Sequence, residues 1–196
     1  DWVLITHHHP DHYGGLAELA KTIEIERIVH LPSDNPTSHW SQTRSRLQRI
    51  RSNRPENFEH LGQFVIQSIL PTRNPHASEN DRSIAVRVSA GLSSLMMTGD
   101  LEAFGERRLV AMGIPPSDAL HLGHHGSRTS STNLFLEAVS PKIAIASCGL
   151  ENRYGFPHPL VSKRLETNNI SVFTTAANGL IRLIPDQSGW TVSTLR

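Results

Sequence analysis

The sequence contains a single cysteine, Cys148, among its 196 residues. A disulfide within the chain and a metal site built from cysteine ligands are therefore both excluded. The residues before it, Ala-Ile-Ala-Ser at positions 144–147, are mostly apolar. This context favours a buried and unreactive thiol.

Long hydrophobic runs are also missing. Hydrophobic residues make up 37% and charged residues 19% of the chain, as in ordinary globular domains. No apolar run approaches the roughly 20 residues that a membrane-spanning helix needs. On the usual scale of about 150 residues per domain, residues 1–196 are predicted to form one domain. Because the chain opens at Asp1, inside a predicted strand, we expect it to be part of a longer protein.

Neither sign of charge is in excess, since the formal net charge is +1. Overall electrostatics therefore argue for neither nucleic acid nor a membrane surface as the partner. The sequence has no glycine-rich dinucleotide loop and no P-loop, and no serine stands in a nucleophile-elbow pattern. The chemistry must come from other residues.

Histidine is abundant, with 12 residues, of which six lie in two clusters. The first cluster is Thr-His-His-His-Pro-Asp-His-Tyr-Gly-Gly at positions 6–15, directly after a short apolar run. Imidazole and carboxylate are ligands for borderline or hard divalent ions. On an extended backbone His7 and His9 point the same way, and Asp11 and His12 then turn a second set of ligands toward a neighbouring position. The motif predicts two metal ions; a purification tag would not continue into this sequence.

Two further ligand groups follow predicted strands. Asp100 comes after a strand at 93–98 and a glycine, a position typical of metal-binding carboxylates and equally of a helix N-cap. His124 and His125 follow a strand at 119–123, and the glycine and serines after them are able to hold a phosphate oxygen. The three strand-end groups supply enough ligands for a dinuclear site, with Asp100 as the bridge. They predict hydrolase chemistry with Zn or Mn.

The hydrophobic pattern predicts an α/β protein. Strands are expected at 2–6, 25–31, 64–70, 84–89, 93–98, 119–123, 142–147, 172–174, 180–184 and 190–195. Helices are expected at 16–20, 101–112, 133–139 and 160–168, with a polar helical segment that presents Trp40, Leu47 and Ile50 on one side. A loop at 33–38 should precede this segment, and Ser130 or Ser131 should cap the helix that begins at residue 133. The first strand, ligand loop, helix and second strand form a βαβ unit.

Arginine is concentrated in one stretch. Between residues 42 and 55 there is no acidic residue, and five arginines occur, namely Arg44, Arg46, Arg49, Arg51 and Arg54. The rest of the chain therefore carries a formal charge of −4, which is 1 − 5. One interpretation is a contact with the phosphate backbone of nucleic acid that does not depend on sequence. The other is a solvated helix face whose arginines meet acids elsewhere, and the sequence leaves both open.

These motifs resemble a known family. The cluster at 6–15 resembles the H-x-H-x-D-H signature of the metallo-β-lactamase fold superfamily. Four downstream blocks, at 80–83, 95–102, 122–130 and 152–159, include Thr-Gly-Asp-Leu-Glu and His-His-Gly-Ser. Their order and spacing resemble the C-terminal hydrolase domain of ComEC-type DNA internalisation proteins of natural competence. The resemblance extends over nearly the whole chain.

The resemblance implies an α/β (α+β) fold, the αββα sandwich, with metals at one edge of two sheets and further N-terminal strands before Asp1. It implies a parent protein in the cytoplasmic membrane of a bacterium, with this domain on the extracytoplasmic side. The implied task is to degrade one strand of incoming DNA while the other enters the cell. The implied partners are DNA, the transmembrane channel portion of the parent chain and other competence proteins.

The resemblance also implies roles for single residues. Two divalent ions, Zn or Mn, would be held by His7, His9, Asp11, His12, Asp100 and one of His124 and His125. His125 is favoured because it directly precedes the glycine, and the implied catalytic residues are Asp11, Asp100 and His125. Support of the ligands or contact with substrate is implied for Asn80, Ser83, Ser127 and His158, and we expect Arg46 and Arg49 to contact DNA.

Two positions depart from the family pattern. His9 stands where many relatives carry aspartate, which makes the first metal site richer in nitrogen and favours Zn. Phe156 stands where relatives commonly read Tyr-Gly-His-Pro. The role of that histidine is therefore lost or passes to His158.

Three functions follow from these observations. The favoured one is a metal-dependent phosphodiesterase that acts on DNA. The second is a hydrolase of the same fold that acts on a small phosphoester, lactone or β-lactam. The third is a catalytically silent DNA-binding module, which salt-sensitive DNA binding without bound metal would indicate.

Overall fold

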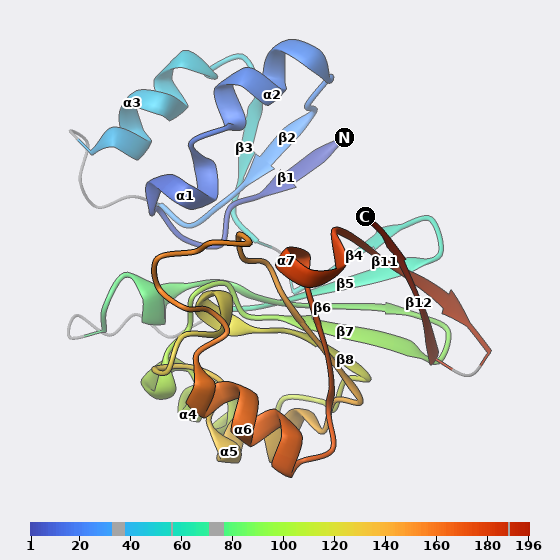
Figure 1. Cartoon of the computed structure of the whole chain (residues 1–196). Helices are drawn as coiled ribbons and strands as arrows, with labels where there is room; N and C mark the ends of the chain where they lie inside the picture. The colour runs from blue at the N-terminus through green and yellow to red at the C-terminus, as the bar shows by residue number, and fades with distance from the viewer. Residues whose placement is uncertain (33–37, 56, 71–76, 188) are drawn as a thin grey trace. The chain divides into compact units, whose positions relative to one another are not determined.

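The computed structural model of the chain describes residues 1–32, 38–55, 57–70, 77–187 and 189–196. The chain divides into two compact units, Asp1–Glu56 and Asn57–Arg196, and Figure 1 shows the elements of each. The loop expected at 33–38 lies outside the described residues except for Ser38. The assignment of residues 1–196 to one domain stays a prediction.

The first unit is built on a parallel three-stranded sheet of order β1-β2-β3. Its strands are β1 (Trp2–Leu4), β2 (Arg27–Val29) and β3 (Arg51–Asn53), and its helices are α1 (Pro10–Tyr13), α2 (Leu16–Thr22) and α3 (His39–Arg46) (Figure 1). The parallel pairing of β1 with β2 across α1 and α2 confirms the βαβ unit. The sequence did not predict β3 or α1, because both are too short to show a hydrophobic period.

The core of the first unit joins the helices to the sheet. Its buried side chains are Ile5, Tyr13, Leu16, Ile25, Ile28, Trp40 and Leu47. As the pattern predicted, α3 and its C-cap turn Trp40 and Leu47 inward, with Ile50 packed partly buried beside them. Ser38 caps α3, since its hydroxyl accepts a hydrogen bond from the Ser41 N–H at 3.2 Å.

The second unit contains a seven-stranded sheet of order β10-β9-β8-β7-β6-β5-β4. The strands are β4 (Phe58–Leu61), β5 (Phe64–Ile69), β6 (Ala85–Ala90), β7 (Ser93–Met97), β8 (Ala119–His121), β9 (Ile143–Ala146) and β10 (Ser171–Thr174). Strands β7 to β10 run parallel to one another, whereas β4 to β7 form an antiparallel meander. All but β4 were predicted; the edge strand β4 is mostly exposed and shows no alternation.

Helices α4 (Ala103–Ala111), α5 (Asn133–Val139) and α6 (Pro159–Thr167) lie together on one face of this sheet (Figure 1). Helix α7 (Thr175–Asn178) leads into a separate hairpin of β11 (Leu180–Asp186) and β12 (Gly189–Leu195). The hairpin is fixed to β7, because the Trp190 indole N–H donates to the Ser94 carbonyl at 2.8 Å. In the part of the chain that the structure describes, no helix is long and apolar enough to cross a membrane.

The packing of the second unit corrects two expectations. Thr132, and not Ser130 or Ser131, caps α5, since its hydroxyl accepts from the Phe135 N–H at 3.3 Å. The Ser130 hydroxyl instead donates to the Gly123 and Ser127 carbonyls. Cys148 is only half-buried, because it stands just beyond β9 at the margin of the core.

The pairing of the central strands places their ends together. Strands β7, β8 and β9 are neighbours and parallel, so the segments that follow them leave from the same edge of the sheet. Asp100 follows β7, the 3-10 turn η2 (Gly123–Gly126) follows β8, and the loop up to His158 follows β9. The turn η1 (Asn80–Arg82) reaches the same edge, because it precedes β6, which runs antiparallel to β7.

Two buried carboxylates connect these segments. Asp81 Oδ1 accepts from the backbone N–H groups of Glu102 at 3.0 Å and Gly105 at 2.8 Å, at the start of α4. Glu106, which is completely buried, accepts from the N–H groups of Ser131 at 2.5 Å and Thr132 at 2.9 Å. Burial raises the pKa of the Glu106 carboxyl, and the N–H donors of Thr132 and Ser131 partly oppose that shift.

We predict that Glu106→Ala lowers the free energy of unfolding by about 2–5 kcal/mol, because it leaves two buried N–H groups without acceptors. Glu106→Gln should cost less, since the amide oxygen still accepts one of the two hydrogen bonds. Urea unfolding followed by circular dichroism measures both. Glu137→Ala on the exposed side of α5 is the control and should change stability by less than about 0.5 kcal/mol; an equal loss in Glu137→Ala and Glu106→Ala would contradict the assigned role.

Candidate metal centre

Three imidazoles of the first cluster gather in the first unit. The ring centroid of His7 lies 4.6 Å from that of His9 and 4.2 Å from that of His12. The Thr6 hydroxyl lies 3.2 Å from His7 Nδ1 and 3.4 Å from His12 Nδ1. Contacts of this kind on one ring nitrogen orient metal-binding histidines so that the other nitrogen serves as the ligand.

Asp11 and His12 stand on the short helix α1. The Asp11 carboxylate is exposed, and its Oδ2 lies 3.7 Å from His12 Nε2. Helix α1 starts with a proline at its first position, directly after His9 in an extended conformation. The chain therefore turns sharply between the two halves of the motif, which lets His9 and His12 both lie close to His7.

His8, the middle histidine, has a different environment. Its ring stacks on the Trp40 indole, with centroids 4.8 Å apart and planes 11° apart. Alternation along an extended backbone explains this, because the side chain between His7 and His9 must point the opposite way. His8 was not among the predicted ligands, and its packing against Trp40 agrees with that omission.

Asp100 is the most buried of the candidate ligands in the second unit. It is 3% exposed and follows Gly99, whose φ of 55° places the backbone in the left-handed region that favours glycine. Its backbone N–H donates to the Ser83 hydroxyl at 3.1 Å. Ser83 is itself completely buried, so of its two predicted roles the structure favours support of the Asp100 turn over contact with substrate.

The turn η2 presents two histidines in an uncommon backbone conformation. His124 and His125 have φ values of 48° and 56°, and Gly126 follows at 87°. Left-handed backbone costs a non-glycine residue roughly 1–2 kcal/mol, and such strain concentrates at functional sites. At Gly126 a side chain is excluded, because a Cβ atom would lie 2.9 Å from the Pro157 Cβ.

The orientation of the His125 ring is set by a backbone carbonyl. His125 Nδ1 lies 3.0 Å from the Ser147 carbonyl oxygen. Because a carbonyl only accepts, Nδ1 must carry the proton, and Nε2 is the ring nitrogen with the lone pair. This is the arrangement found in metal-ligating histidines, whose second nitrogen donates to a carbonyl or carboxylate.

His124 lies between two carboxylates. Its Nε2 is 3.8 Å from Asp100 Oδ2 and its Nδ1 is 3.5 Å from Glu102 Oε1. Glu102 in turn accepts from the Thr129 hydroxyl at 2.8 Å. Both ring nitrogens of His124 thus face acids, so this geometry favours His125 over His124 as the ligand. The sequence did not single out Glu102 and Thr129 as its partners, because neither stands in a ligand cluster.

The remaining predicted residues of the second unit lie at the same edge of the large sheet. Asn80 has a buried Oδ1 with no hydrogen-bond partner in the described part of the chain, and the Ser127 hydroxyl lies 3.1 Å from that of Thr129. His158 starts α6, where its Nδ1 accepts from the Leu160 N–H at 3.2 Å. The Phe156 ring stacks against that of His125, with planes 17° apart and centroids 6.5 Å apart.

A model of the metallo-beta-lactamase superfamily matches residues 1–149. The chain belongs to this superfamily. It is 32% identical to competence protein ComA of Neisseria gonorrhoeae, covering 100% of this chain and 27% of that protein. It is 31% identical to ComE operon protein 3 of Bacillus subtilis, covering 93% of this chain and 24% of that protein. It is 29% identical to recombination protein 2 of Haemophilus influenzae, covering 92% of this chain and 22% of that protein. The chain spans about a quarter of the length of these curated relatives.

Solved structures show the fold. CmlA, a diiron beta-hydroxylase from Streptomyces venezuelae, superposes with a TM-score of 0.58 at 16% identity, covering 88% of this chain and 43% of that one. Zn(2+)-bound PqqB from Methylobacterium extorquens superposes with a TM-score of 0.53 at 14% identity, covering 88% and 70%. The predicted α+β metallo-β-lactamase fold is confirmed, and the resemblance to competence proteins is confirmed by the curated relatives.

Each unit contains residue types that fit a divalent metal. Candidate ligands are present in the first unit at His7, His9, Asp11 and His12 and in the second at Asp100 and His125. A buried carboxylate such as Asp100 is costly unless it is paired or binds a metal. The donor set of imidazole and carboxylate, together with the proton position on His125, suits the superfamily's usual divalent ions.

We predict that His125→Asn lowers the affinity for Zn or Mn by more than about 100-fold, because it removes a ligand, whereas His124→Asn should cost about 10–100-fold or less, as expected for a supporting residue. Asparagine is chosen because it tolerates the left-handed backbone better than most residues. Isothermal titration calorimetry on the metal-free protein measures both affinities. A larger loss in His124→Asn would reverse the assignment.

Proposed function

We propose that this chain is the metal-dependent nuclease domain of a DNA internalisation protein and that it cleaves phosphodiester bonds of incoming DNA. Three curated relatives support this proposal. One is named a competence protein and another a ComE operon protein, and the matches to all three cover 92–100% of this chain. The observation that carries it is a pair of residues. Asp100 is buried, and its backbone N–H donates to the Ser83 hydroxyl. His125 carries its proton on Nδ1, which faces the Ser147 carbonyl.

The proposed site takes two divalent ions, Zn or Mn. The residues that would hold them are His7, His9, Asp11, His12, Asp100 and His125. When bound, such a pair activates a water molecule near neutral pH and stabilises the charge that develops on the phosphate. Histidine at position 9 makes the ligand set richer in nitrogen and favours Zn over Mn.

The chain's own residues prepare this site. Ser83 fixes the turn that carries Asp100, and the Ser147 carbonyl fixes the proton on His125. Glu102, itself held by Thr129, faces Nδ1 of His124 and orients that ring toward Asp100. In the proposal His124 is a neighbour of the metal ligands and supports Asp100, toward which its Nε2 points.

Arg46 and Arg49 are exposed, on α3 and just after it. In the proposal they contact the DNA backbone and so hold the strand independently of its sequence. The parent protein would lie in the cytoplasmic membrane of a bacterium, with this domain on the extracytoplasmic side. Its transmembrane channel portion and other competence proteins would be the partners.

We predict that Asp100→Ala reduces metal-dependent DNA cleavage by about a thousandfold or more, since loss of a metal ligand removes several kcal/mol of transition-state stabilisation. Labelled single- and double-stranded DNA, incubated with Mn, Zn and Mg in turn, provides the assay. The control is Glu166→Ala on the exposed side of α6, which should retain full activity.

Full DNA cleavage by Asp100→Ala would refute the proposed mechanism. Turnover of small phosphoesters, lactones or β-lactams by the unaltered chain, without any cutting of DNA, would identify a small-molecule hydrolase. Salt-sensitive DNA binding with no metal on elemental analysis would identify a silent binding module.

A second prediction concerns DNA affinity. Replacing Arg46 and Arg49 together by Glu should weaken binding at low salt, and the difference from the unaltered chain should disappear at high salt, where charges are screened. Fluorescence anisotropy with a labelled oligonucleotide measures this. Arg107→Glu with Lys163→Glu, two exposed positions on α4 and α6, changes the net charge equally and should have the smaller effect; an equal effect would show that only net charge matters.

A further inference from the structure

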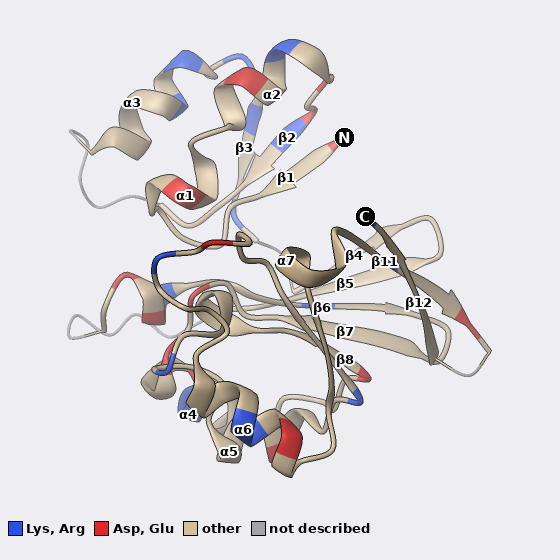
Figure 2. Ribbon diagram, viewed as in Figure 1, with Lys and Arg blue, Asp and Glu red and all other residues tan. Residues whose placement is uncertain are grey.

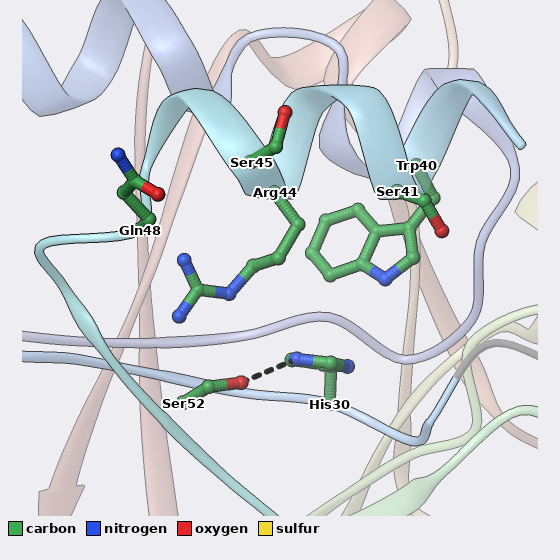
Figure 3. Close-up of a pocket in the computed structure, with 7 residues that line it drawn as sticks. All are labelled: His30, Trp40, Ser41, Arg44, Ser45, Gln48 and Ser52. Atoms are coloured by element: carbon green, nitrogen blue, oxygen red, sulfur yellow. Dashed lines mark hydrogen bonds between the residues drawn. The ribbon is translucent and has the colours of Figure 1, made fainter. Parts of the chain in front are cut away.

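The first unit contains a pocket of about 470 Å³ beneath α3. Trp40, Arg44 and Gln48 line one side, and His30 and Ser52 from the sheet line the other (Figure 3). Ser41 and Ser45 complete the lining with hydroxyl groups. None of these residues belongs to the ligand set that the superfamily implies.

Arg44 is a half-buried cation without a carboxylate partner among the described residues. Its Nη1 and Nη2 atoms donate to the carbonyls of Leu47 at 2.5 Å and Ile50 at 2.6 Å, and its Nε is buried without a hydrogen-bond partner. Burial lowers the pKa of the Arg44 guanidinium, which reflects the cost of keeping the charge there. A partly desolvated charge of this kind is stabilised by a counter-ion.

The surroundings select a negative ligand. Residues 38–55 contain five arginines and no acid, and Figure 2 shows positive residues without negative ones on α3 and β3. All other lining residues are polar or aromatic, and none is a carboxylate. The local potential in the pocket is therefore positive although the whole chain is nearly neutral.

The floor of the pocket is a neutral hydrogen-bonded pair. His30 Nδ1 donates to the Leu31 carbonyl at 2.5 Å, so Nε2 accepts from the Ser52 hydroxyl at 2.6 Å. Burial lowers the pKa of His30, the hydrogen bond to the Leu31 carbonyl partly opposes that shift, and the charge of Arg44 adds to it. The pKa is therefore below its usual value, and the imidazole is neutral at pH 7. The donors left for a ligand are the outer N–H groups of Arg44 and the side-chain amide of Gln48.

The burial of Trp40 favours a phosphate group over a nucleobase as the ligand of this pocket. The indole is only 2% exposed, and one of its faces is covered by His8. Recognition of a base normally uses an accessible aromatic face for stacking, and this pocket does not offer one. A guanidinium fork and an amide suit the oxygens of a phosphate group instead.

We propose that this pocket is a phosphate-binding subsite, separate from the metal ligands, in which Arg44 and Gln48 hold the phosphate oxygens. The phosphate comes either from the backbone of a nucleic-acid strand or from free phosphate. The subsite goes beyond the proposed nuclease activity and does not require it, because binding here involves no metal and no bond cleavage.

The test is nuclear magnetic resonance of the 15N-labelled 196-residue chain in the presence of EDTA. The signals to follow are the Arg44 Nε–H and the Gln48 side-chain amide. Inorganic phosphate and a short single-stranded oligonucleotide are titrated separately. Saturable shifts with both probes, or with one, support the subsite and identify the source of the phosphate; no shift with either at millimolar concentration overturns it.

Gln48→Glu is the decisive variant, because it places a carboxylate in the pocket without touching the hydrogen bonds of Arg44. It should weaken binding of the phosphate probe by about tenfold or more, as expected for a like charge near the ligand. Gln42→Glu, exposed on α3 outside the pocket lining, is the matched control with the same change in charge. It should change the affinity by less than about twofold. Equal losses in the two variants would overturn the proposal, whatever the outcome for DNA cleavage.

Discussion

The positions of the candidate ligands in the second unit depend on the parallel pairing of β7, β8 and β9. Parallel neighbours end at the same edge of a sheet, so three segments far apart in sequence are delivered to one place without any direct link between them. Asp100, the two histidines of η2 and the Phe156–His158 loop all arrive this way. A ligand cluster at this edge needs only a suitable residue just beyond each strand, which is the pattern that the sequence displays.

The segments beyond these strands need further contacts to hold a defined conformation, and buried polar groups provide them. Asp81 ties η1 to the start of α4, and Glu106 ties α4 to the segment before α5. Both carboxylates satisfy backbone N–H groups that would otherwise be buried without acceptors. The left-handed turn at His124 and His125 is costly, and it persists because its neighbours are held in this way. The site is therefore supported by residues that never meet a substrate.

Most of the sheet and the metal-binding motifs could be predicted from the sequence, because short segments rich in apolar and β-branched residues and clustered histidines are strong local signals. The short strand β3 and the one-turn helix α1 could not, since neither is long enough for a period to show. Contacts between distant residues were also out of reach. Nothing local reveals that Glu102 faces His124 or that Thr132 caps α5 in place of its serine neighbours.

The arginines of one segment also show how little the sequence alone says about the contacts of a side chain. The five arginines of residues 42–55 look equivalent in sequence, yet Arg44 turns back to cap the carbonyls of Leu47 and Ile50 while Arg46 and Arg49 stay exposed. Position relative to the end of α3 decides this, because Arg44 stands in the last turn, within reach of the carbonyls of the segment that follows the helix. A basic stretch thus contains residues with different environments and different tasks, which the sequence alone does not separate.

In the first unit the Trp40 indole contacts both the metal motif and the phosphate pocket. Trp40 stacks on His8, between the ligands His7 and His9, and also lines the pocket with Arg44. Shared contact alone does not couple two sites, since coupling requires an element with two arrangements that each ligand biases differently. Trp40 is almost completely buried and is packed against Tyr13 and His30 as well. With no alternative position open to this indole, it acts as a rigid wall, and phosphate in the pocket should bind with the same affinity whether or not the metal ligands are occupied.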